Sequence, residues 1–157
     1  MRFWDSSAIV PLCLEQPLTE PARALHQSDS ELVVWWGSPI ECASAIARLH
    51  REGHLTDEQE VAARELLATV RASWFEMQPG EAIREQALRL LRVHPLRAAD
   101  ALQLAAALEW AGSPVAGAFV TFDGRLSAAA RREGFTTADQ PLLTKLRRTL
   151  DEETGRC

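Results

Sequence analysis

The chain has 157 residues, of which 46% are hydrophobic and 25% charged, and these values fit one compact domain with its own core. The formal net charge of −5 argues against broad, salt-driven binding to nucleic acid, although it leaves room for a local basic groove. Three widely separated cysteines favour neither a disulfide framework nor a zinc site, so we expect a reducing, cytoplasmic compartment. We expect no membrane span, because the longest apolar stretch, residues 105–110, is short and contains Glu109.

The N-terminal residues predict a short strand over residues 1–4 that ends at Asp5, with a helix beginning at Ser6 or Ser7. Pro11 should bend that helix or end it early. A carboxylate at the C-terminal end of a parallel strand lies where ligand crevices form in open sheets. The alternative is that Asp5 only caps the helix that follows it.

Helices and strands alternate along the rest of the chain. Residues 32–36 form a continuous apolar run, which is typical of a strand buried on both faces of a parallel sheet. The other expected strands are residues 72–77, 116–122 and, at an edge, 135–137. The other expected helices are residues 17–28, 38–53, 56–70, 81–93, 96–112, 125–133 and 141–150. This alternation predicts a single α/β domain over residues 1–150, with a mainly parallel sheet of four or five strands and a polar tail at 151–157.

Four acids share one kind of position in this scheme. Asp5 and Asp123 end strands, whereas Glu41 and Asp100 lie in the first turns of helices. Because the carboxyl ends of parallel strands meet at one edge of a sheet, these carboxylates could converge there. Each acid also has a purely structural alternative. Glu41 completes a capping box with Ser38, Asp100 suits the dipole of its helix, and Asp123 can cap the next helix.

Clustered carboxylates repel one another, so they must either hold protons or share a cation. The segments around the four acids contain no histidine or lysine to neutralise them. Ligand sets made only of oxygen select hard divalent ions such as Mg²⁺ or Mn²⁺. Such a centre can activate water and stabilise an in-line displacement at phosphorus.

Four segments together resemble the PIN-domain proteins, and specifically the VapC-like toxin ribonucleases of type II toxin–antitoxin systems. They are residues 3–8 (FWDSSA), 38–41 (SPIE), 99–105 (ADALQLA) and 119–126 (FVTFDGRL). The resemblance implies a three-layer α/β/α sandwich around the parallel sheet, and Mg²⁺- or Mn²⁺-dependent endonucleolytic cleavage of RNA. It also implies a homodimer and a cognate antitoxin whose tail occupies the groove of the active site.

The resemblance assigns a role to each acid. Asp5, Asp100 and Asp123 would hold the metal, directly or through water, and Glu41 would bind metal or orient the attacking water. Two hydroxyl residues, Ser6 and Thr121, match further positions of the family pattern. Ser6 would bind a metal-bound water or a phosphate.

Two arginines, Arg97 and Arg125, are the best placed to meet an RNA phosphate, although an ordinary solvated surface is the alternative for both. Two basic pairs, residues 131–132 and 147–148, are candidates to extend the groove. We expect Ile40 on the inner face of its helix. We expect Trp35, Trp36 and Trp74 in the core rather than as platforms for base stacking.

Two other classes of protein are alternatives to the ribonuclease. A phosphoacceptor signalling module generally needs a lysine beside the phosphate, and the only lysine here is Lys145, far from the acids. A PIN-like adapter would keep the fold and bind RNA or a protein without cutting. The intact set of four acids argues against the adapter.

Overall fold

A fully parallel, five-stranded sheet forms the centre of the computed structural model, which describes residues 1–137. The strands lie in the order β3-β2-β1-β4-β5. Their bounds are Arg2–Trp4 (β1), Leu32–Trp35 (β2), Phe75–Met77 (β3), Ala118–Val120 (β4) and Thr136–Thr137 (β5). The α/β class and the parallel sheet predicted from the sequence are therefore confirmed. The expected helix at 141–150, the tail at 151–157 and the domain boundary at residue 150 lie outside the described residues.

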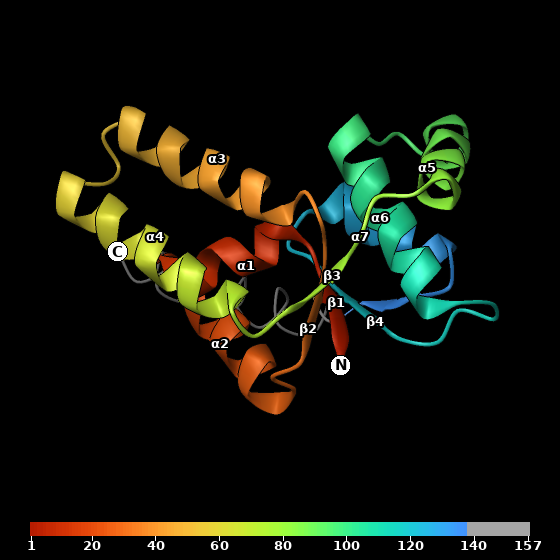
Figure 1. Ribbon diagram of the computed structural model, residues 1–157, viewed down its shortest axis with the longest axis horizontal. Helices are drawn as coiled ribbons and strands as arrows, with labels where there is room; N and C mark the ends of the chain where they lie inside the picture. Colours follow the sequence, from red (N-terminus) through yellow and green to blue (C-terminus); the bar gives the residue numbers. More distant parts are fainter. Residues whose placement is uncertain (138–157) are drawn as a thin grey trace, which may run out of the picture.

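Helices cover both faces of the sheet (Figure 1). They are α1 (Ser6–Cys13), α2 (Thr19–Ser28), α3 (Ser38–Arg51), α4 (Asp57–Arg71), α5 (Glu81–Val93), α6 (Ala98–Ala111) and α7 (Gly124–Arg132). Successive residues of a strand point to opposite faces, so Phe3 packs in the core beneath α5, α6 and α7, whereas Trp4 packs in the core beneath α1, α3 and α4. The molecule is thus the expected three-layer sandwich.

The two central strands, β1 and β4, end side by side. Trp4 is in register with Val120, and the backbone N–H of Asp5 donates to the Val120 carbonyl at 2.9 Å. The strand β2 runs parallel on the other side of β1, with Val33 opposite Phe3. The starts of α1, α3 and α7 therefore lie at the same edge of the sheet.

The first turn of helix α6 also lies near this edge of the sheet. It packs against α5 and also contacts β2 and α7, and its apolar face is buried, as its composition predicts. A proline precedes it at residue 95, and its own first turn carries Asp100. The fold thus delivers the starts of four helices to one region.

Several local predictions were wrong. Ile40 is 64% exposed, because the buried stripe of α3 runs through Ser38, Cys42 and Ile46 instead. Trp36 is 46% exposed, because β2 ends one residue earlier, at Trp35. The other two tryptophans named above, Trp35 and Trp74, are buried as expected.

Other boundaries shift by a few residues. Strand β3 begins at Phe75 rather than at residue 72, because α4 continues to Arg71 and residues 72–73 form a turn. Helix α1 contains Pro11 and ends soon after it, at Cys13. Within residues 1–137, no helix has the length and hydropathy needed to cross a membrane.

Candidate active site

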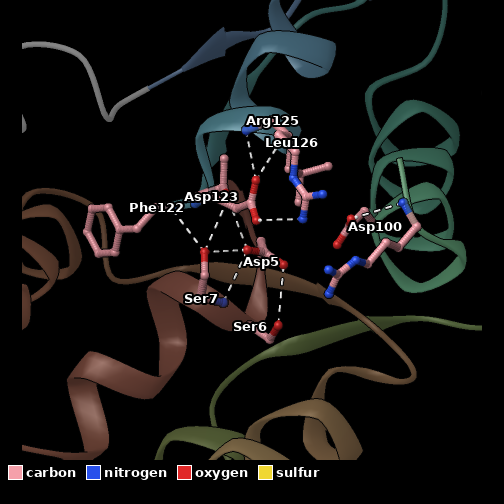
Figure 2. A network of polar contacts seen from close by, with 10 residues as sticks. Asp5, Ser6, Ser7, Asp100, Phe122, Asp123, Arg125 and Leu126 are labelled. Atoms are coloured by element: carbon pink, nitrogen blue, oxygen red, sulfur yellow. Dashed lines mark hydrogen bonds and ion pairs between the residues drawn. The ribbon is translucent and has the colours of Figure 1, made fainter. Parts of the chain in front are cut away.

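Asp5 lies at the centre of the polar network that forms where β1 ends (Figure 2). Its side chain is buried, with 4% of the residue surface exposed. It caps α1, because Oδ2 accepts the backbone N–H of Ser7 at 3.1 Å. The same oxygen accepts the hydroxyls of Ser7 and Thr121, the latter at 3.0 Å. The structural role predicted as an alternative is therefore present, but it occupies only one of the two carboxylate oxygens.

Ser7 and Thr121, which we call the hydroxyl pair, join the end of β1 to the turn that follows β4. Their oxygens lie 3.2 Å apart. Ser7 Oγ accepts the backbone N–H of Phe122 at 2.9 Å, and Thr121 Oγ1 accepts that of Asp123 at 3.1 Å. Each hydroxyl thus donates toward Asp5 and accepts from the turn. The sequence singled out Thr121 but missed Ser7, whose only signal was its place one residue after Ser6.

Glu41 approaches Asp5 from α3, and Ser6 lies between them. Ser6 Oγ is 3.0 Å from Glu41 Oε2 and 3.3 Å from Asp5 Oδ1. The predicted capping box with Ser38 does not form, since Gly37 is the N-cap of α3 and makes no side-chain cap. The Glu41 carboxylate is therefore directed to the site rather than to its own helix.

Ser38 has a different partner from the one predicted. It is fully buried, and its hydroxyl lies 3.2 Å from Nε2 and 3.4 Å from Oε1 of Gln103 on α6. Gln103 is itself only 1% exposed. The sequence did not identify Gln103, although a glutamine one turn after Asp100 in an otherwise apolar helix was a usable signal.

Asp100 points from the first turn of α6 toward the side of the site that holds Asp5 (Figure 2). One of its oxygens, Oδ2, accepts the backbone N–H of Arg97 at 3.1 Å. This contact is favourable at a helix N-terminus, so the structural alternative is again realised in part. The second oxygen makes no hydrogen bond within the described residues that would withdraw it from the site.

Asp123 caps its helix with two hydrogen bonds from backbone N–H groups. Its Oδ1 accepts the N–H groups of Arg125 and Leu126 at 2.8 and 3.0 Å, at the start of α7. Its Oδ2 lies 3.8 Å from the Arg125 guanidinium. Asp123 joins the network through the Thr121 hydroxyl rather than by facing Asp5 directly.

The electrostatics of Asp5 reflect its burial. Burial raises the pKa of Asp5 above its ordinary value, and the hydrogen bonds from Ser7 and Thr121 offset part of this rise. The negative charge of Asp100 raises the pKa of Asp5 further. Asp5 and Asp100 are therefore close enough to repel each other.

Glu41 follows the same pattern. Burial raises its pKa, hydrogen bonds from Gln103 and Ser6 oppose the rise, and the charges of Asp5 and Asp100 add to it. Three carboxylates from β1, α3 and α6 thus share one electrostatic environment. A cation bound among them would relieve both the burial cost and the repulsion.

The oxygen donors at the site determine which kind of metal the residues fit. Within residues 1–137, no three Asp, Glu, His or Cys side chains come close enough to form a ready-made metal centre. Mg²⁺, however, keeps several waters in proteins and usually binds through one or two carboxylates. The carboxylates of Asp5 and Asp100, with the Ser6 hydroxyl beside them, supply only hard oxygen donors. The set fits a largely hydrated Mg²⁺ or Mn²⁺ rather than a closed protein cage.

The two predicted phosphate-binding arginines are both exposed. Arg97 precedes α6 beside Asp100, and Arg125 follows Asp123, so each flanks one of the acids. Arg131 instead donates to Ser127 and Thr137, within α7 and toward β5. The second predicted basic pair, residues 147–148, lies outside the described residues.

Comparison with known proteins gives one match to a family and a set of similar structures. The family model described as "PIN domain" matches residues 2–132. A solved structure titled "Crystal Structure of FitAcB from Neisseria gonorrhoeae" superposes with a TM-score of 0.62 and 16% sequence identity, and covers 90% of this chain and 99% of that chain. At this identity the similarity establishes a common fold. No curated protein gave a significant match to the sequence.

Proposed function

The chain belongs to the PIN-domain family, whose members are in general nucleases, and from this membership we propose that it is a metal-dependent endoribonuclease. One observation carries the proposal. Asp5 and Glu41 come from separate parts of the chain, and yet the Ser6 hydroxyl lies 3.3 Å from one carboxylate and 3.0 Å from the other. The charge of Asp100, from a third part, raises the pKa of both. Structural capping alone gives no reason to bury Asp5 and Glu41 side by side near a third acid.

The geometry gives each of these residues a different role. Asp5 is held through Oδ2, which leaves Oδ1 to face the cation site together with Asp100. Asp123 would contribute through its second carboxylate oxygen, by way of water. A bound Mg²⁺ or Mn²⁺ would supply an activated water and offset the negative charge that develops on the phosphate.

Glu41 would orient the attacking water and accept its proton. The Ser6 hydroxyl fixes one Glu41 oxygen at 3.0 Å, and a carboxylate with a raised pKa is a better base than an ordinary one. Arg97 and Arg125 would hold the RNA phosphates on either side of the acids, because both side chains are exposed and a guanidinium forms charge-assisted hydrogen bonds with phosphate.

We further propose that the enzyme is the toxin of a toxin–antitoxin pair, with a cognate antitoxin and a homodimer as its partners. This part of the proposal is supported by the four sequence segments that resemble the VapC-like toxins. Its test is isolation of the protein with the product of the neighbouring gene, and measurement of whether that product suppresses RNA cleavage.

A catalytically silent adapter is the second candidate. The observation that favours it is the absence, within the described part of the chain, of three acids already gathered around a metal position. Titration with Mn²⁺ separates the two, because an adapter has no reason to bind the ion.

The endoribonuclease itself is tested by cleavage of a mixed set of structured RNAs with Mg²⁺, Mn²⁺ or EDTA. Discrete cuts that require metal support the proposal. A folded protein that neither cuts RNA nor binds Mn²⁺ supports the adapter instead.

A further inference from the structure

Gln103 and Ser38 form a buried polar contact between two helices that carry acids. Gln103 lies one turn after Asp100 on α6, and Ser38 lies one turn before Glu41 on α3. The Gln103 amide nitrogen is 3.2 Å from Ser38 Oγ. Both side chains are almost completely removed from solvent. The contact therefore joins α6 to the first turn of α3, one turn away from each acid.

Burial of this polar pair costs more free energy than burial of two apolar side chains would. An amide and a hydroxyl lose their hydration on burial and recover it only through hydrogen bonds with defined geometry. The neighbours of Gln103 on α6 are Ala101, Leu104 and Ala105, which pack without that requirement. A leucine at residue 103 would fill similar space, but it would not fix the rotation or the spacing of α3 against α6.

The amide also lies near the acid itself, because Gln103 lowers the pKa of the Glu41 carboxyl. Glu41 is thus held by Ser6 on one side and supported by Gln103 on the other. On α6, the same side of the helix that carries Gln103 carries Asp100, three residues earlier.

We propose that Gln103 is a positioning residue, which holds the first turns of α3 and α6 at a fixed separation so that Glu41 and Asp100 face the same phosphate. The inference rests on the proposed nuclease function for its consequence in catalysis. The mechanical part, a fixed contact between α3 and α6, is independent of that function.

The test compares Gln103→Leu, Ser38→Ala and the double variant with the wild type. Ile83→Val is the matched control, because Ile83 is a buried residue of α5 that takes no part in the site. Three quantities are measured: hydrogen exchange of residues 38–42 without metal, the dissociation constant for Mn²⁺, and kcat and KM for an RNA that the wild type cuts.

The proposal expects faster exchange at the start of α3 in Gln103→Leu than in Ile83→Val. It expects Mn²⁺ affinity and kcat to fall about tenfold or more, with KM little changed, since loss of a group that orients a metal ligand typically costs that much. Because the two residues act as a unit, the double variant should be no worse than the worse single variant.

Wild-type exchange over residues 38–42 in Gln103→Leu would overturn the proposal, whatever the activity. So would exchange that changes equally in the Ile83→Val control. If the wild type neither binds Mn²⁺ nor cuts RNA, the proposed function fails, and the exchange measurement still decides whether Gln103 fixes α3 against α6.

Discussion

The hydroxyl of Thr121 donates a 3.0 Å hydrogen bond to Oδ2 of Asp5, across 116 residues of sequence. It also accepts the backbone N–H of Asp123, so one oxygen couples the ends of two central strands. Asp5 is therefore held in place by a neighbouring strand and not only by its own helix. The position of the central acid is a property of the assembled sheet.

Replacement of Thr121 by valine should destabilise the protein by about 1–3 kcal/mol, because the shape is kept while the hydrogen bonds to Asp5 and from Asp123 are lost. Urea denaturation measures the change in the free energy of unfolding. Thr121→Ser keeps the hydroxyl and should remain closer to the wild type than Thr121→Val does. Equal stability of wild type and Thr121→Val would show that the hydrogen bonds contribute nothing net.

In the metal-free protein, the contribution of Asp5 to stability should fall as the pH rises from about 4 toward neutrality. Burial raises the pKa of Asp5, so between its unfolded and folded pKa the native state binds more protons than the unfolded state. In that window the free energy of unfolding falls with rising pH. Asp5→Asn removes this titration, so the free energy of unfolding of the wild type should fall relative to that of the variant across this window.

Urea midpoints measured with EDTA at several pH values test this dependence. A difference between Asp5→Asn and wild type that does not change over the window would contradict it. Added Mn²⁺ should recover stability in the wild type but not in the variant, because the ion binds the charged carboxylate.

Removal of the Ser6 hydroxyl should impair cleavage more than folding. Ser6 bridges Asp5 and Glu41 and is only partly buried, so Ser6→Ala frees Glu41 without opening a core cavity. We expect kcat to fall about 10–100-fold, with little change in the melting temperature. Ser44→Ala, at an exposed position of α3, is the control and should behave as wild type. Full activity in Ser6→Ala would remove the bridge from the mechanism.

Adjacent tryptophans should differ in their importance to stability. Trp35 is buried with Phe3 and Val33, and its truncation to alanine should cost about 3–5 kcal/mol. Trp36 lies past the end of β2 and is nearly half exposed, so Trp36→Ala should cost about 1 kcal/mol or less. Chemical denaturation of the two variants side by side checks this difference. Similar losses would contradict the placement of Trp36 outside the core.

The approach of Asp5 and Glu41 at one edge was predictable, because strand ends can be recognised from short apolar runs and parallel strands end at one edge. Two of their partners, Ser6 and Thr121, were singled out as well, but Ser7 and Gln103 were not. Ser38 and Gln103 are 65 residues apart, and nothing local to either residue announces the contact. The Ser-x-x-Glu pattern reads as a capping box in any chain, and only the burial of Ser38 directs its hydroxyl elsewhere. Trp36 shows the same limit, since an apolar run does not mark where hydrogen bonding of the strand stops.

The most direct test of the central claim is cleavage of one RNA substrate by wild type and Asp100→Asn in parallel, with Mg²⁺, with Mn²⁺ and with EDTA. The substitution keeps the size of the side chain and one oxygen for the Arg97 N–H, so the helix start should survive. We predict discrete cuts by the wild type that require metal, and their loss in the folded variant. Metal-dependent cuts of equal rate by Asp100→Asn would contradict the assignment of the acids as the catalytic centre.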